Sequence, residues 1–582
     1  MKLVAELDQA GPSQTPDKPA GPSAGALAAR SAAWAVLLVP AALALWSAHA
    51  IRETYAPIPY WDEWVEMNRW RTAPDHWLAY LWSQHNEHRI LFPRLVFLAD
   101  WKWFQARDGL NLLAVGLIQL AGAAFFVTAA RVRGARPLTL LGLAVGAGLL
   151  CLLLQWQNLF WGFQVQFVGV YAASAWAIYA FATATREPGA TRRGSFCAAM
   201  ALLVVATFSM SNGVLAGAVM VAVGLATRRS LRATALAGIV TAALLVLYLH
   251  DFQPVPHHSP AGLVLQHPGR FVTFAAAYLG SIWFPKSVAG AACAGLLGGL
   301  ATAGMLLVLV REGGRDASRS ALFGVALLVL ASASITAFGR LMFGVEGGLS
   351  SRYMTPAAYF WAAQALFWPL TLERAGPALA RRAAAVVLVA GVAALIPLQA
   401  IGDHQIRKAR EETLLGASAL LGRVDDPEAV HALYLDTDFV QDVAAFLRAR
   451  RLALFSDPPV ATVGERFVRA AAAAELCRGS IDILTPVPHA AAPATWRILG
   501  WGWDVEARSA FSRVVLVDDR GEVLGIGLSG MTRDDVPRGV RQVTTRAAGW
   551  MAAADRGAGT EIAAYGILRN GRACPLGRRA WP

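Results

Sequence analysis

The chain has 582 residues, of which 56% are hydrophobic and 16% are charged, and its formal net charge is +13. A soluble domain carries about 25% charged residues, so a shortfall over several hundred residues predicts an integral membrane protein. The arginines stand in short clusters between apolar runs and not along one soluble face, so we expect no nucleic-acid partner.

Residues 1–30 are rich in Pro, Gly, Ala and Ser, which predicts a disordered cytoplasmic leader. A first apolar run follows, from about Ser31 to Ala50. Its end, Ser47-Ala48-His49-Ala50, also resembles the small-residue site of a cleaved signal peptide. The long leader, with only Arg30 just before the apolar run, favours an uncleaved span.

Ten further apolar runs have the length that crosses a bilayer. They lie near 110–130, 137–154, 166–184, 195–211, 213–227, 233–250, 288–310, 320–339, 355–371 and 383–400. We expect residues 271–287 to lie at the interface or to re-enter. The chain is therefore predicted to be mainly α, a polytopic α-helical membrane protein with about 11 transmembrane helices.

Alternate connections between these runs carry arginines in threes. The five sets are Arg131, Arg133 and Arg136; Arg186, Arg192 and Arg193; Arg228, Arg229 and Arg232; Arg311, Arg315 and Arg319; and Arg374, Arg381 and Arg382. The positive-inside rule assigns all five connections to the cytoplasm. The N-terminus is then cytoplasmic, and everything after residue 401 is extracytoplasmic.

We predict a transmembrane domain at 31–400 that includes a first extracytoplasmic loop at 51–109. Residues 401–490 have the paired charges of amphipathic helices, and 491–582 has short alternating runs that predict a small β-sandwich. Cys477 and Cys574 could form a disulfide in an extracytoplasmic tail, although their spacing matches no disulfide framework.

The loop from 51 to 109 is dense in ionisable and aromatic residues. Asp62 and Glu63 stand side by side shortly after the first span. Such a carboxylate can act as a general base or hold a divalent cation such as Mg or Mn. The alternative is an acidic pair that caps a helix beginning near Trp64. Adjacent acids point apart on a helix, so only one is expected to face a site.

Seven tryptophans fall in the same loop: Trp61, Trp64, Trp70, Trp77, Trp82, Trp101 and Trp103. An aromatic belt on interfacial helices explains most of them. Trp61 adjoins the acids and is a candidate for stacking on a sugar ring.

Charged residues also crowd the segment 84–94, where His85, Glu87, His88, Arg89 and Arg94 stand among apolar and aromatic residues. Arginine forks suit a phosphate, whereas an ion-pair network that fixes the loop is the structural alternative. His85 and His88 have helical metal spacing, but no third ligand follows at a metal-site distance. Polar groups gather on the same predicted face at Asn158 and at Arg352-Tyr353.

At these residues the chain resembles the GT-C superfamily of polytopic membrane glycosyltransferases. The similarity covers Asp62-Glu63 after the first span, the helices expected over 64–104, and the many-span body with a soluble C-terminal domain. Asn86-Glu87-His88-Arg89 and Ser351-Arg352-Tyr353 are similar to patterns in bacterial membrane proteins assigned to glycosyl transfer. The segment from Gly500 to Val536 resembles a β-sandwich module of bacterial surface-polysaccharide proteins.

The resemblance implies a bacterial inner-membrane enzyme that moves a sugar from a polyprenyl-phosphate carrier to a cell-envelope glycan or lipid acceptor. Asp62 or Glu63 would be the catalytic base, and Arg89, Arg94 and Arg352 would bind the donor phosphate. The remaining substrate-binding candidates are Trp61, His85, Asn86, Glu87, His88, Asn158 and Tyr353.

Three alternatives stay open. A transporter or flippase of lipid-linked glycans would need polar residues through the bilayer midplane and internal repeats, neither of which is evident. A polysaccharide polymerase or ligase shares the carrier chemistry but centres it on a large later loop. A non-enzymic glycan-binding surface protein leaves the charged cluster of the first loop without a purpose.

Overall fold

A computed structural model describes residues 31, 34–72, 75–131, 136–187, 190–255, 259–472, 474–487 and 495–582. The predicted leader (1–30), Arg133 and the predicted boundary at 490 lie outside the described residues.

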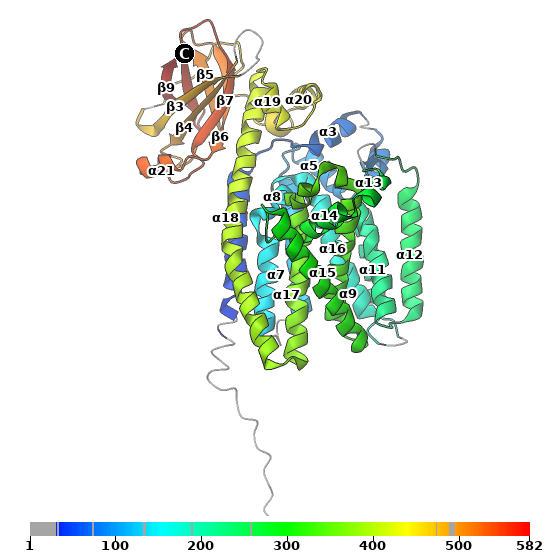
Figure 1. The fold of residues 1–582 in the computed structure, drawn as a ribbon. Helices are drawn as coiled ribbons and strands as arrows, with labels where there is room; N and C mark the ends of the chain where they lie inside the picture. The colour runs from blue at the N-terminus through cyan, green and yellow to red at the C-terminus, as the bar shows by residue number, and fades with distance from the viewer. Residues whose placement is uncertain are drawn as a thin grey trace, which may run out of the picture.

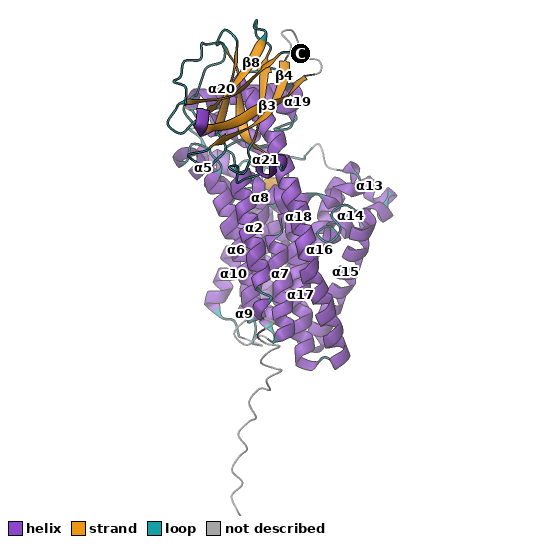
Figure 2. Cartoon of the chain, turned by 90° about the vertical axis from the view of Figure 1, so that its left-hand side faces the viewer, coloured by secondary structure: helices purple, strands orange, loops and turns teal. Residues whose placement is uncertain are grey.

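The largest part of the molecule is a bundle of long helices that run roughly side by side (Figures 1 and 2). Its members are α2 (Leu38–Thr54), α6 (Gly109–Ala130), α7 (Pro137–Cys151), α9 (Val165–Ala184), α10 (Arg193–Thr207), α11 (Val214–Ala226), α12 (Leu231–Leu249), α15 (Val288–Arg311), α16 (Ala317–Arg340), α17 (Met354–Ala375) and α18 (Ala378–Gly422). Shorter helices α8 (Trp156–Phe160), α13 (Ala261–Gln266) and α14 (Pro268–Gly280) lie at one end of the bundle (Figure 1).

Among the described residues, seven helical segments are long and apolar enough to cross a membrane. They are Gly109–Ala130, Pro137–Phe160, Gly162–Ala184, Leu231–Leu249, Val288–Arg311, Ala317–Phe343 and Ala378–Gly422. The predicted number of about 11 spans is not supported. The helices α10 and α11 have 15 and 13 residues, or roughly 20 Å of helix against a hydrocarbon core of about 30 Å. The segment 271–287 lies mostly in α14, which has 13 residues.

The centre of the bundle is formed by α7, α9, α16 and α17, whose buried residues lie all around each helix. Small residues allow this close packing. A Cβ added at Gly142 of α7 would meet the carbonyl oxygen of Ala365 in α17 at 2.0 Å, so these two backbones touch only because position 142 has no side chain.

The segment between α2 and α6 forms a small layer across one end of the bundle (Figure 1). It contains α3 (Asp62–Thr72), α4 (Trp77–Trp82) and α5 (Leu91–Trp103), and a hairpin of β1 (Gln84–His85) and β2 (His88–Arg89). Helices thus occupy the stretch in which interfacial helices were expected, and the neighbouring long helices end at Thr54 and begin again at Gly109.

The helix α18 has 45 residues, roughly 68 Å of helix, and continues beyond the bundle (Figure 1). Residues 401–422, part of the segment predicted to form amphipathic helices, are therefore the continuation of the last apolar helix. Two shorter helices, α19 (Pro427–His431) and α20 (Thr437–Arg450), follow it.

The C-terminal strands form a single antiparallel sheet in the order β3-β4-β7-β6-β5-β8-β9. The strands are β3 (Cys477–Pro486), β4 (Thr495–Asp504), β5 (Arg513–Asp518), β6 (Val523–Met531), β7 (Gly549–Asp555), β8 (Glu561–Ile567) and β9 (Ala573–Ala580), and α21 (Asp535–Gly539) follows β6. The edge strands β3 and β9 lie against each other and Cys477 and Cys574 join them by a disulfide. The sheet is close to a barrel and is not the predicted two-sheet sandwich. It also begins at 477, inside the segment expected to be helical.

Polar contacts fix the sheet to the end of α18. The Ser418 hydroxyl donates to the Ile526 carbonyl of β6 at 2.7 Å and accepts from the Ala553 N–H of β7 at 2.9 Å. Arg497 of β4 binds Asp426, before α19, through two nitrogens at 2.7 Å each. Such buried, bidentate contacts hold one orientation of the sheet on the helix.

Candidate functional site

A pocket of about 820 Å³ opens between the first-loop layer and the ends of α9 and α16. Seven residues predicted from the sequence line it together: Asp62, His85, Asn86, Glu87, His88, Arg352 and Tyr353. The other lining residues are Trp161, Phe163, Gln164, Gln166, Phe167, Met210, Ser211, Asn212, Ile335, Thr336, Gly339 and Arg340. We refer to this cavity as the first-loop pocket.

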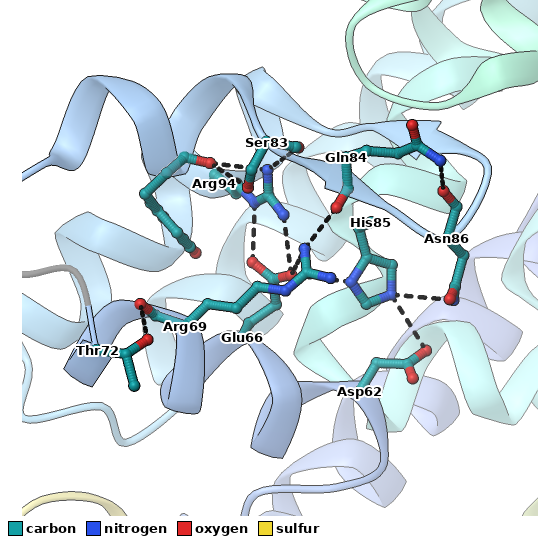
Figure 3. A network of polar contacts seen from close by, with 10 residues as sticks. Asp62, Glu66, Arg69, Thr72, Ser83, Gln84, His85, Asn86 and Arg94 are labelled. Atoms are coloured by element: carbon teal, nitrogen blue, oxygen red, sulfur yellow. Dashed lines mark hydrogen bonds and ion pairs between the residues drawn. The ribbon is translucent and has the colours of Figure 1, made fainter. Parts of the chain in front are cut away.

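Asp62 and His85 line one side of the first-loop pocket, and Figure 3 shows their side chains beside each other in a network of polar contacts. His85 Nε2 lies 3.8 Å from Asp62 Oδ2, and His85 Nδ1 lies 2.8 Å from Glu66 Oε1. The arrangement follows from helical spacing, because Asp62 and Glu66 are four residues apart on α3 and share one face. The imidazole is buried and packs on Phe163, whereas the Asp62 side chain is 28% exposed.

Glu66 is the centre of this network and was not among the residues predicted from the sequence. Arg94 donates from Nε to Glu66 Oε2 at 2.8 Å and from Nη2 to Oε1 at 3.0 Å. Burial raises the pKa of Glu66, but Arg94 and His85 outweigh it and hold the pKa well below the usual range. Glu66 is therefore a fixed negative charge behind His85.

The two carboxylates around His85 determine its charge. Burial would lower the pKa of His85, but Asp62 and Glu66 more than offset that effect and the net pKa is raised. Hydrogen bonds thus run from the buried Arg94 through Glu66 to His85, and a longer ion-pair contact of 3.8 Å continues to Asp62, the member with the most exposed side chain.

Glu63 points away from the first-loop pocket. Its carboxyl accepts from the N–H groups of Tyr60 at 2.8 Å and Phe163 at 3.1 Å. Burial and the neighbouring Asp108 raise its pKa well above the usual range. Burial likewise raises the pKa of Asp108, to about 7, so this carboxyl is partly protonated at neutral pH. Of the acidic pair, only Asp62 lines the first-loop pocket.

Arg89 and Arg94 were predicted to bind phosphate, and the structure gives both another role. The Arg89 guanidinium donates to the backbone carbonyls of Tyr248, Trp82 and His250. Arg94 is fully buried on Glu66 and on the carbonyls of Tyr80 and Ser83. These guanidinium groups hold the first-loop layer together, which is the structural alternative left open above.

Arg352 and Arg340 are the cations that reach the pocket. Arg340 Nη2 lies 2.9 Å from Glu87 Oε1. The Arg352 guanidinium lies over the Tyr353 ring at 5.5 Å and forms no hydrogen bond or ion pair with any residue that the structure describes. An arginine without an anionic partner in a partly buried pocket is a site for a carboxylate or phosphate.

Trp61 and Asn158 do not line the pocket. The Trp61 ring packs edge-on against Tyr434, at 6.3 Å, and the backbone N–H of Trp61 donates to the Leu433 carbonyl at 2.8 Å. Asn158 is buried and donates to the Arg352 carbonyl at 2.8 Å and to Thr355 Oγ1 at 2.6 Å. Asn158 therefore positions the backbone that carries Arg352.

Neutral polar groups complete the lining. Burial lowers the pKa of His88 to about 4, so this imidazole is neutral at pH 7. The side-chain oxygens of Gln164 and Gln166 are buried and have no hydrogen-bond partner among the described residues. Buried amides without partners are uncommon in proteins, and a ligand hydroxyl would satisfy them.

The acidic pair does not fit a divalent cation. Asp62 faces His85 whereas Glu63 faces Asp108, so their carboxylates do not converge. Within the described ranges no group of three or more His, Cys, Asp or Glu side chains is placed to hold a metal ion.

Comparison of the chain with protein-family models, curated proteins and solved structures found no match to any of them.

Proposed function

We propose that this protein is a membrane glycosyltransferase that moves a sugar from a polyprenyl-phosphate carrier to a glycan or lipid acceptor. The observation that carries the proposal is the convergence of a supported carboxylate, Asp62, and a cation without a partner, Arg352, in one pocket beside membrane-spanning helices. The resemblance to GT-C proteins around Asp62 supports the same assignment.

Asp62 is the group suited to act as general base. In the proposed reaction an acceptor hydroxyl attacks the anomeric carbon, the bond between that carbon and the phosphate oxygen breaks, and Asp62 takes the hydroxyl proton. His85 holds the Asp62 carboxylate, and Glu66 with Arg94 fixes the imidazole in turn. This support keeps the base oriented without a metal ion.

Arg352 and Arg340 are suited to the departing polyprenyl phosphate. Both reach the pocket from the ends of bundle helices, where a lipid-linked phosphate at the membrane surface would lie. Their positive charge offsets the charge that develops on the phosphate as the bond breaks. The carbonyl oxygens of Gln164 and Gln166 would accept hydrogen bonds from sugar hydroxyls.

In this proposal the first-loop pocket faces the extracytoplasmic side of the bacterial inner membrane. The Cys477–Cys574 disulfide supports that side, because disulfides persist in oxidising compartments and the sheet lies toward the same end of the bundle as the first-loop layer (Figures 1 and 2). The arginine-rich connections are then cytoplasmic.

The test is sugar transfer in proteoliposomes supplied with a panel of radiolabelled polyprenyl-phosphate sugars. Wild type should transfer from at least one donor, and Asp62→Asn should lose at least a hundredfold in rate because a general base contributes about 10²–10⁴-fold. Glu63→Gln, which changes the carboxyl that faces away from the pocket, should keep activity within severalfold at matched amounts of folded protein.

Loss of transfer in Glu63→Gln with full activity in Asp62→Asn would contradict the assignment of the base. Movement of the lipid-linked sugar across the bilayer by wild type, with no transfer from any donor, would favour a flippase instead.

A further inference from the structure

A second cavity, of about 940 Å³, lies between the end of α18, the end of α20 and the sheet. Among the residues that the structure describes, four arginines line it, Arg423, Arg448, Arg451 and Arg513, and Asp457 is the one acidic lining residue. We refer to this cavity as the arginine groove. It lies outside the first-loop pocket and shares no lining residue with it.

The single carboxylate does not neutralise the groove. Asp457 is shared between Arg513, at 3.2 Å, and Arg107 at 2.7 Å. Arg448 donates to the Leu420 carbonyl at 2.6 Å and stacks on the ring of Phe455 at 4.6 Å. Burial and the neighbouring Arg423 lower the pKa of Arg448. The groove thus holds several guanidinium groups close together with too little negative charge to balance them.

Arg423 and Arg451 are the arginines free to bind a ligand. Both are exposed, and neither side chain forms a hydrogen bond or ion pair with the described part of the chain. They end α18 and α20 with φ of +55° and +53°, a left-handed conformation that glycine adopts more readily. Each therefore stands at a helix C-terminus and faces the groove from a different helix.

The position of the groove excludes a lipid headgroup as its ligand. The apolar part of α18 ends near residue 400, and Arg423 follows roughly 34 Å further along the helix at 1.5 Å per residue. The headgroup layer extends only about 5–8 Å beyond the hydrocarbon core. An anion that reaches the groove must therefore be soluble or part of a polymer that extends from the surface.

One helix connects the groove to the first-loop layer. Arg448 and Arg451 come from the end of α20, and other residues of this helix contact α3, which carries Asp62. Phe446 packs edge-on against Trp70 at 6.1 Å, and Asp442 pairs with Arg71. A chain bound in the groove thus lies one helix away from the helix that holds the proposed base.

We propose that the arginine groove binds an anionic saccharide, one whose sugars carry carboxylate or phosphate groups. Arginine forks bind such groups through paired hydrogen bonds, and Pro458, Pro459 and Leu454 supply apolar walls for the sugar rings. If the proposed glycosyl transfer is correct, this saccharide is the acceptor of the sugar. The binding of the saccharide in the groove does not depend on that proposed function.

The test is direct binding of hexagalacturonate to the full chain in detergent, without any donor, with maltohexaose as the neutral comparison. Wild type should bind the acidic oligomer and not the neutral one, and binding should weaken with added salt. Arg423→Gln/Arg451→Gln should weaken binding tenfold or more, because both charge-assisted contacts are lost. A matched double variant, Arg450→Gln/Arg556→Gln, removes two exposed arginines outside the groove and should bind within twofold of wild type.

Absence of hexagalacturonate binding to wild type would overturn the proposal, as would equal loss in both double variants. The proposal would also be overturned if the saccharide does not bind but inorganic phosphate, an acidic peptide or phosphatidylglycerol vesicles bind in a way that depends on Arg423 and Arg451. Groove-dependent binding by a protein that transfers no sugar would support the groove and contradict only the glycosyltransferase assignment.

Discussion

Three arginines that the sequence analysis assigned to phosphate binding differ in their contacts in the structure. Arg94 is bound to a carboxylate and Arg89 to carbonyl groups within the protein, whereas the Arg352 side chain, from a distant part of the chain, has no hydrogen-bond or ion-pair partner among the described residues. The sequence predicted that all three lie near one site. It could not distinguish the arginines with partners in the protein from the one without, because the partners of Arg89 lie as far away in the sequence as Tyr248 and His250.

Replacement of Arg94 should therefore act on stability. Arg94→Gln leaves Glu66 as a buried charge with one fewer partner, and breaking such a pair costs about 3–5 kcal/mol. Thermal unfolding in detergent should show a strongly lowered midpoint. Arg69→Gln is the comparison, because Arg69 is more exposed and lies 3.5 Å from the same carboxylate, so its effect should be smaller. If Arg94→Gln leaves the stability unchanged and raises the KM for the donor, the result would indicate that Arg94 binds the donor phosphate.

At the scale of the element, α3 shows what periodicity can predict. Adjacent acids point apart on a helix, and the structure separates Asp62 from Glu63 in this way. The same spacing places Glu66 one helical turn after Asp62 on the same face of α3, so the sequence does contain a signal for Glu66. The contact between Glu63 and Asp108 could not be foreseen, since it depends on how α3 packs on the start of α6.

That contact predicts a pH dependence of stability. The folded-state pKa of Asp108, about 7, lies above the value of about 3.9 in an unfolded chain, and that of Glu63 is also raised. The folded state therefore binds more protons than the unfolded state between these values, and the free energy of unfolding falls as pH rises through this window. The slope is at most about 1.4 kcal/mol per pH unit for each group.

Unfolding midpoints from pH 5 to pH 8 measure this effect. Wild type should be more stable at pH 5, and Asp108→Asn should flatten the profile because the group no longer ionises. An equally steep profile in Asp108→Asn would show that other groups cause it.

At the scale of the whole molecule, local sequence patterns predicted the helices and strands better than they predicted how these elements assemble. Alternation along 491–582 predicted strands, but only long-range pairing makes them one near-barrel sheet, with β3 drawn from the preceding segment. Each predicted apolar run coincides with a helix, yet the runs at α10 and α11 form helices too short to count as spans. Run length in the sequence does not fix where a helix ends.

The Cys477–Cys574 disulfide is expected to stabilise the folded protein. The bridge joins the two edge strands across 97 residues, and a bridge closing a long loop typically contributes about 2–4 kcal/mol. Cys477→Ser/Cys574→Ser should lower the unfolding midpoint of the purified protein, and reductant should lower that of wild type but not of the variant. Equal midpoints for the two oxidised proteins would show that the bridge does not stabilise the sheet.

The most direct test of the central claim is steady-state sugar transfer by Asp62→Asn and Arg352→Gln in proteoliposomes, with kcat and donor KM measured separately. If the first-loop pocket is the active site, Asp62→Asn lowers kcat at least a hundredfold with little change in donor KM, because only the base is lost. Arg352→Gln should raise donor KM, with a further loss in kcat where the arginine stabilises the departing phosphate. Wild-type kcat and KM in both variants, at equal amounts of folded protein, would contradict the assignment of the pocket.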